Sequence, residues 1–193
     1  MRIFGVILAG GAARRMGADK ALVPLQGRPL VEWVAERLEP QVDTLALSAN
    51  GAAERFGFLN LPVLPDRVSK GPLSGILAGL KWAAPLGATA VVSAPCDGPF
   101  LPPDLVPRLC LAAEGGFTAF ATSGQDRHPT YALWPVGLIA ALEDFLASDA
   151  VPRLRDFAMA HGARAADFPP GSFANANTPD DLAELAAMLG RRE

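Results

Sequence analysis

The sequence predicts a three-layer α/β fold, in which a mainly parallel sheet carries helices on both faces. The first observation behind this prediction is that short apolar runs alternate with helical segments along the chain. The second is the apolar run over residues 88–94, which is typical of a strand buried on both faces of a parallel sheet. The third is length: 193 residues can enclose one substantial core, so we expect residues 1–193 to form a single domain.

The first half of the chain is expected to alternate strands with helices. Apolar runs predict strands over residues 3–7, 42–47, 61–64 and 88–94. The prolines in the third run place it at a sheet edge or make it very short. Apolar residues at helical spacing predict a helix over residues 29–38, a short helix over 52–56, and a clear helix that opens at residues 71–75.

The second half is expected to contain a hairpin and several helices. Residues 117–121 and 128–134 predict strands joined by a turn, which would add an antiparallel member of the kind common at sheet edges. Helices are predicted over residues 103–113, 136–146 and 152–161, and a last short strand over 164–168. A final helix begins after Thr178, because threonine caps helices, Pro179 suits the first position and acidic residues favour the positive end.

The composition excludes several classes of protein. Half of the residues are hydrophobic and 19% are charged, which is typical of a globular chain and not of a disordered one. A formal net charge of -3 gives no electrostatic basis for binding nucleic acid or an anionic membrane surface. No run approaches the roughly 18 apolar residues of a membrane span, and 2 cysteines are too few for a disulfide framework. We therefore expect a cytoplasmic protein without nucleic-acid or membrane partners.

The loop after the first strand, residues 8–20, has the composition of an anion site. Its paired glycines allow a sharp turn that presents backbone N–H groups, and Arg14, Arg15 and Lys20 supply positive charge for a polyphosphate. The alternative is an ordinary turn with solvated arginines, but the glycines, arginines and lysine together favour the anion site. The loop lacks the spacing of a classical P-loop or of a dinucleotide-binding fingerprint.

Polar residues follow the predicted strands at Gly10, Asn50, Asp66 and Asp97. Ligands of open parallel sheets bind beyond the carboxyl ends of the strands, so these residues predict one site at one edge. Asp97 is the best candidate for binding Mg²⁺, which takes one or two protein carboxylates and completes its shell with phosphate oxygens and water. Asp66 suits a contact to a nucleoside or to the metal, although a solvated turn residue explains it nearly as well. Asn50 suits a base or ribose edge, although a turn-forming asparagine before Gly51 explains it equally well.

Two further groups are open to more than one interpretation. Arg127 can meet a phosphate, whereas His128 is more often a histidine hydrogen-bonded beside a strand than a general base. Cys96 is interpreted as a small residue packed at a strand end, because no base is fixed beside it to make it a nucleophile.

The first loop, with Leu-Ala-Gly-Gly at 8–11, Arg-Met-Gly at 15–17 and Asp-Lys at 19–20, resembles the signature loop of nucleotidyltransferases with a Rossmann-like fold. Four later motifs resemble the molybdenum cofactor guanylyltransferases of that superfamily. They are Gly-Pro-Leu-Ser-Gly at 71–75, Pro-Cys-Asp-Gly-Pro-Phe-Leu-Pro at 95–102, Arg-His-Pro at 127–129 and Asn-Thr-Pro-Asp-Asp-Leu at 177–182. The motifs extend over nearly the whole chain, and the later set is more specific than the loop.

The resemblance implies an Mg²⁺-dependent enzyme that transfers GMP from GTP to Mo-molybdopterin and releases pyrophosphate. Leu8, Ala9 and Gly10 match the family's GTP-binding backbone, and Lys20 matches its phosphate-binding lysine. Asn50 and Asp66 fall at its other nucleotide-contact positions.

The remaining matches concern catalysis and the second substrate. Asp97 matches the catalytic, Mg²⁺-binding aspartate, and Arg15 matches an arginine that meets the triphosphate beside Lys20. The second substrate is expected near Arg127, His128 and Asn177. One departure from the family pattern is Gly98, which stands at a commonly polar position.

The resemblance also implies that the product passes to molybdoenzymes or to their chaperones. Two other functions stay open at this point. One is a related nucleotidyltransferase for another nucleotide or acceptor, such as a molybdopterin cytidylyltransferase or a sugar-phosphate nucleotidyltransferase. The other is a non-catalytic module for binding nucleotides or delivering cofactor, which would not need to keep both Lys20 and Asp97.

Overall fold

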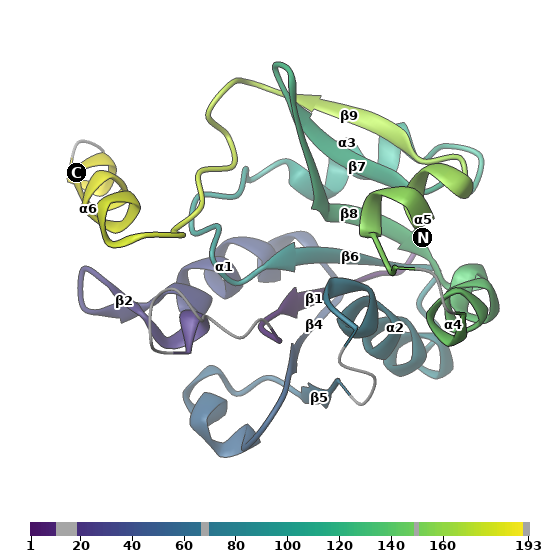
Figure 1. Ribbon diagram of the computed structural model, residues 1–193, viewed down its shortest axis with the longest axis horizontal. Helices are drawn as coiled ribbons and strands as arrows, with labels where there is room; N and C mark the ends of the chain where they lie inside the picture. Colours follow the sequence, from purple (N-terminus) through teal and green to yellow (C-terminus); the bar gives the residue numbers. More distant parts are fainter. Residues whose placement is uncertain (11–18, 67–69, 149–150, 191–193) are drawn as a thin grey trace.

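The computed structural model describes residues 1–10, 19–66, 70–148 and 151–190. Its main sheet has 7 strands in the order β5-β4-β1-β6-β8-β7-β9 (Figure 1). In chain order these strands are β1 (Ile3–Leu8), β4 (Thr44–Ala49), β5 (Val63–Pro65), β6 (Ala90–Pro95), β7 (Ala119–Ser123), β8 (Asp126–Pro135) and β9 (Arg164–Phe168). The predicted strands are all present, with ends shifted by a few residues.

One strand of this sheet runs against the others. β1 pairs in parallel with β4 and β6, β4 with β5, and β7 with β9, whereas β8 is antiparallel to both of its neighbours. The prediction of a mainly parallel sheet with an antiparallel member is therefore confirmed. The reversed strand lies inside the sheet and not at its edge, because its residues from Tyr131 to Trp134 are buried and β7 and β9 extend the sheet beyond it.

Helices cover both faces of the sheet. On one face lie α1 (Leu30–Leu38) and α3 (Leu105–Ala112), which share a buried cluster with Ile3 and Ile7 of β1. On the other face lie α2 (Pro72–Ala83), α4 (Ile139–Ala147) and α5 (Leu154–Ala160), which share a cluster with Phe4 and Val6. Within the described ranges, no helix combines the length and apolar character needed to cross a membrane.

A small hairpin, β2 (Pro24–Leu25) and β3 (Arg28–Pro29), was not expected from the sequence. Its turn residues Gln26 and Gly27 have φ angles of 50° and 80°, the left-handed pair that a two-residue hairpin turn requires. The last helix, α6 (Pro179–Leu189), packs on this hairpin and stands apart from α4 and α5 (Figure 1). The third apolar cluster, which joins them, contains Val23, Leu25, Leu30, Phe100, Ala176, Leu185 and Leu189.

Several short segments form 3-10 helix. They are η1 (Lys20–Leu22), η2 (Glu39–Gln41), η3 (Ala53–Leu59), η4 (Ala84–Leu86) and η5 (Val136–Leu138). The short helix predicted over residues 52–56 is therefore η3, and the helix predicted over 136–146 divides into η5 and α4. The predicted start of α6 is confirmed, because Thr178 Oγ1 accepts a hydrogen bond from Asp181 N and Thr178 N donates to Asp181 Oδ2.

Gly98 is explained by a residue that lies far from it in the sequence. A Cβ atom at Gly98 would lie 1.5 Å from the hydroxyl oxygen of Tyr131 and 2.9 Å from its Cζ atom. Tyr131 belongs to β8 and is fully buried, so it cannot move aside easily. The turn that contains Asp97 therefore rests directly on the tyrosine, and only glycine fits at this point of the turn.

We expect Gly98→Ala to lower the free energy of unfolding by about 1–3 kcal/mol, the usual cost of overpacking. In a Tyr131→Phe background the same substitution should cost less, because the clashing oxygen is then absent. Urea unfolding of the four proteins of this double-mutant cycle measures the difference.

Gly137→Ala is the matched control, since a Cβ there meets no atom within 4 Å. Equal costs for Gly98→Ala in the two backgrounds would show that the tyrosine hydroxyl does not impose the glycine.

Candidate active site

The carboxyl ends of three neighbouring strands meet at one edge of the sheet. Leu8 at the end of β1 pairs with Ser48 of β4 and with Pro95 of β6. Beyond these pairs, Ala9 N donates to Ser48 O over 2.8 Å, and Cys96 N donates to Leu8 O over 3.1 Å. The chain therefore leaves all three strands side by side, as the sequence predicts.

Gly10, Asn50 and Asp66 lie together on one side of this edge. A Cβ atom at Gly10 would lie 3.5 Å from Asp66 Oδ2 and 3.9 Å from Asn50 Nδ2. Asp66 follows β5 and is buried, with 8% of its surface exposed, so it is not the solvated turn residue of the alternative interpretation. Three of the predicted nucleotide-contact residues thus form one group beside the end of β1.

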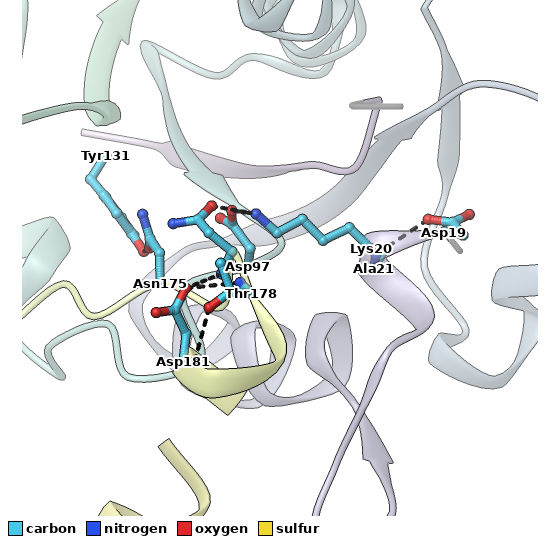
Figure 2. A network of polar contacts seen from close by, with 9 residues as sticks. Asp19, Lys20, Ala21, Asp97, Tyr131, Asn175, Thr178 and Asp181 are labelled. Atoms are coloured by element: carbon cyan, nitrogen blue, oxygen red, sulfur yellow. Dashed lines mark hydrogen bonds and ion pairs between the residues drawn. The ribbon is translucent and has the colours of Figure 1, made fainter. Parts of the chain in front are cut away.

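Lys20, Asp97 and Asn177 form a second group at the same edge. The Lys20 ammonium forms an ion pair with Asp97 Oδ2 and donates to Asn177 Oδ1 over 2.7 Å (Figure 2). Asp19 fixes the backbone at the lysine by capping η1, where its Oδ1 accepts from Ala21 N over 3.2 Å. Residues that the sequence assigned to the phosphates, to the metal and to the second substrate are therefore in direct contact.

The second carboxylate oxygen of Asp97, Oδ1, indicates what kind of ligand the site suits. Asp97 Oδ1 is buried and accepts no hydrogen bond from any residue that the structure describes. A buried carboxylate oxygen without a donor is costly unless a cation or a ligand completes it. No cluster of three or more histidine, cysteine, aspartate or glutamate side chains was found among the described residues. The donor set therefore suits a cation such as Mg²⁺, which needs a single protein carboxylate when phosphates supply the rest.

The segment before α6 is tied to Asp97 by its backbone. Ala176 N donates to Asp97 O over 2.9 Å, and the neighbouring Asn175 accepts a hydrogen bond from the Tyr131 hydroxyl over 3.4 Å. Asn177 N donates to Asp181 Oδ2 over 2.8 Å, and this bond is the main reason why the pKa of Asp181 is lowered from its ordinary value. An ionised Asp181 thus holds the backbone of Asn177, whose side chain accepts the hydrogen bond from Lys20.

Sequence reasoning did not assign a role to Tyr131, Asn175 or Arg55. Arg55 Nε lies 2.9 Å from Asp19 Oδ2, and its guanidinium also donates to Asn50 O over 2.5 Å, so it links the two groups of the site. Asn175 could have been found from its alternation with Asn177, since alternate residues of an extended segment face the same way. Nothing in the sequence signals the contacts of Tyr131 and Arg55, which depend on tertiary structure.

Three predicted residues lie apart from these groups or outside the description. Arg127 is exposed on β8, and its guanidinium has no ion pair with another described residue. His128 Nε2 lies 2.7 Å from Ser123 Oγ, and its ring is 4.6 Å from that of Phe173. Burial lowers the pKa of His128, so the neutral imidazole prevails around neutral pH. Arg15 lies outside the described residues.

Cys96 is a packing residue. Its side chain is buried in the cluster on the α1 face, and burial raises the pKa of its thiol to about 12. A thiol with this pKa is not a nucleophile, which confirms the sequence-based interpretation.

Comparisons with known proteins show which sequences and structures this chain is similar to. The model of the MobA-like NTP transferase domain matches residues 5–165. A molybdenum cofactor guanylyltransferase of Cereibacter sphaeroides is 55% identical over 191 residues, with 98% of each chain covered. A relative of the same name from Rhodobacter capsulatus is 51% identical over 194 residues, covering 98% of this chain and 97% of that one.

Solved structures share the fold at lower sequence identity. Molybdopterin-guanine dinucleotide biosynthesis protein A from Archaeoglobus fulgidus has a TM-score of 0.78 at 22% identity, with 97% of this chain and 99% of that chain covered. A 4-diphosphocytidyl-2C-methyl-D-erythritol synthase from Anaerococcus prevotii has a TM-score of 0.79 at 17% identity, with 98% and 96% covered. These structures support the fold, whereas the sequence relatives and the family model identify the family. The chain belongs to the MobA-like NTP transferases, in the family of the molybdenum cofactor guanylyltransferases.

Proposed function

We propose that this protein transfers GMP from GTP to the terminal phosphate of Mo-molybdopterin, giving molybdopterin guanine dinucleotide and pyrophosphate. The observation that carries the proposal is the meeting of Lys20, Asp97 and Asn177 at the carboxyl edge of the sheet, in a chain 55% identical to a guanylyltransferase. Nucleotidyl transfer needs charge neutralised on the triphosphate and an acceptor phosphate held beside it. Lys20 can supply the first of these requirements directly, and Asp97 could do so by holding a cation.

The nucleotide would bind across the end of β1. The backbone of Leu8, Ala9 and Gly10 borders the site there, and Gly10 leaves room in front of Asp66 and Asn50. Asp66 can accept hydrogen bonds from a nucleoside, and the amide of Asn50 can both donate and accept. The triphosphate would then extend toward Lys20, whose ammonium lies at the end of β6.

In the reaction the acceptor phosphate attacks the α-phosphorus of GTP, and pyrophosphate leaves. Lys20, together with Arg15, would stabilise the negative charge that grows on the departing phosphates. Asp97 would hold Mg²⁺ through the oxygen that lacks a hydrogen bond. When bound, Mg²⁺ supplies further neutralisation of phosphate charge. The attacking phosphate is already ionised, so no general base is required of the neutral His128.

The second substrate would approach from the β8 side of Asp97, where Arg127 and His128 begin the reversed strand. Asn177 accepts a hydrogen bond from Lys20 beside Asp97, so its amide could help to position the acceptor phosphate. We assign the reaction to the cytoplasm, where Cys96 and Cys110, which are both free, would stay reduced. The product would pass from there to a molybdoenzyme or to its chaperone.

The base preference can be tested by thermal unfolding in the presence of Mg²⁺ and one nucleoside triphosphate at a time. GTP should raise the melting temperature more than ATP, CTP or UTP, because the ligand that binds the folded state best stabilises it most. Equal or better stabilisation by CTP would contradict the guanine assignment and favour a cytidylyltransferase.

Asp97→Asn should reduce turnover of GTP with Mo-molybdopterin by at least about a hundredfold, the scale of losing one electrostatic contact to a transition state. The amide keeps the shape of the side chain, so folding should survive, which circular dichroism can verify. Turnover is measured as the rate of pyrophosphate release. The matched control is Asp104→Asn, which alters an exposed carboxylate paired with Arg108 and should leave this rate unchanged. Near-normal turnover of Asp97→Asn would remove this residue from catalysis.

Lys20→Met should weaken GTP binding by about ten- to a hundredfold, the usual loss for a hydrogen bond to a charged group. Calorimetric titration of GTP into the variant measures this change directly. Lys81→Met removes an exposed lysine that pairs with Glu143 and should leave the affinity unaltered. An unchanged GTP affinity in Lys20→Met would mean that the lysine serves only to hold Asp97.

A further inference from the structure

A hollow of about 380 Å³ opens on the α5 face of the sheet, on the side of β8 away from β6. Its walls come from β7, β8, β9, the turn between β7 and β8, and the end of α5. The residues that line it include Thr122, Gln125, Asp126, Arg127, Met159 and Asp167. We propose that this hollow binds the pterin ring of the second substrate, an inference that rests on the proposed function.

The register of the sheet connects the hollow to the reacting groups. Arg127 of β8 pairs with Thr122 of β7, and Thr122 pairs with Asp167 of β9, so these residues form a row across three strands. Ser93 of β6 pairs with Ala132 of β8. Ala132 also pairs with Phe120 of β7, and Thr122 lies two residues beyond Phe120, because the register of β8 shifts between Ala132 and His128. The row therefore lies level with Pro95 at the end of β6, two residues before Asp97.

The length of this row fits one molecule of substrate. Neighbouring strands are about 4.8 Å apart, so the three spacings from β6 to β9 amount to about 14 Å. A tricyclic pterin with a phosphorylated arm can place its ring over β7 and β9 and its phosphate beside Asp97. The volume of the hollow lies within the range of about 300–1,000 Å³ that small-molecule pockets occupy.

The polar groups of the hollow match the edge of a pterin. Its pyrimidine ring presents an N–H group and an exocyclic amino group side by side, and a carboxylate accepts hydrogen bonds from both. Asp167 is exposed, and its Oδ1 accepts a hydrogen bond from the Thr122 hydroxyl. This bond orients the carboxylate, and Oδ2 accepts no hydrogen bond from another described residue. Thr122 is buried, with 8% of its surface exposed, so the orientation is firmly held.

Other residues give the hollow an apolar floor and a cationic rim. Phe120 and Ala165 lie on the same face of the sheet as Thr122 and Asp167, and Met159 of α5 adds a flexible apolar wall that is 50% exposed. Arg127 has no ion pair with a described residue, and it lines the hollow from β8, the strand next to β6, which ends just before Asp97. Its guanidinium is thus placed to contact the phosphorylated arm while the ring contacts Asp167.

The test compares Asp167→Asn with the wild-type chain. The amide can still accept the Thr122 hydrogen bond, but it brings an NH₂ group toward the donors of the ring. The KM for Mo-molybdopterin should rise by about ten- to a hundredfold, since hydrogen bonds to a charged group are lost. The KM for GTP should stay within about twofold. Titration with fluorescent 6-hydroxymethylpterin, without any nucleotide, should show the same loss of affinity.

The control is Asp144→Asn, which alters an exposed carboxylate of α4 that does not line the hollow. This variant should change neither the KM for Mo-molybdopterin nor the KM for GTP. The pterin site would be overturned if Asp167→Asn left the KM for Mo-molybdopterin and the affinity for 6-hydroxymethylpterin unchanged. If the wild type still turned over GTP with Mo-molybdopterin, the proposed function would stand. A wild type that binds 6-hydroxymethylpterin through Asp167 but does not use GTP with Mo-molybdopterin would overturn the proposed function alone. Equal increases in both KM values would indicate a structural role for Asp167 and would also overturn the inference.

Discussion

The ion pair between Lys20 and Asp97 is the contact on which the arrangement of the site depends. It joins Lys20, which follows the first loop, to Asp97, which follows β6. Lys20 also donates a hydrogen bond to Asn177, which lies just before the last helix. The side chains of Lys20 and Asp97 are only 19% and 16% exposed, so each charge has lost much of its water and needs the other. A pair of this kind adds little net stability to the fold. Its effect is to fix where the charged groups stand.

The β2–β3 hairpin and α6 hold the two residues that surround Asp97. Lys20 leads through η1 into the β2–β3 hairpin, and Asn177 leads into α6. The hairpin and α6 pack on each other through Leu25, Leu185 and Leu189, away from the main sheet. This small cluster therefore holds both partners of Asp97 from outside. The cationic group is in place before any ligand arrives, which reduces the reorganisation that binding requires.

Most of the sheet could be predicted from the sequence because its strands are buried on both faces and are visibly apolar. The position of β8 could not, because a hairpin pattern shows that two strands are antiparallel but not where they join the sheet. The β2–β3 hairpin was missed because strands of two residues have no periodicity, and only Gln26-Gly27 marks its turn. The convergence of Gly10, Asn50, Asp66 and Asp97 was predictable from strand ends alone. The requirement for glycine at position 98 could not be predicted, because it arises from contact with Tyr131, and no local rule connects residues so far apart in the sequence.

The single reversed strand explains how one edge can serve two substrates. β5, β4, β1 and β6 all end at this edge, and the loops that follow them supply the groups assigned to the nucleotide. Because β8 runs the other way, it begins at the same edge and brings Arg127 and His128 there without a further crossover helix. β7 and β9 then end beside it, which adds Thr122 and Asp167. Asp97 follows β6 and therefore lies at the boundary between the two halves of the sheet. In the proposed reaction the transferred phosphorus must lie at this boundary, and the topology places Asp97, the aspartate proposed to be catalytic, there.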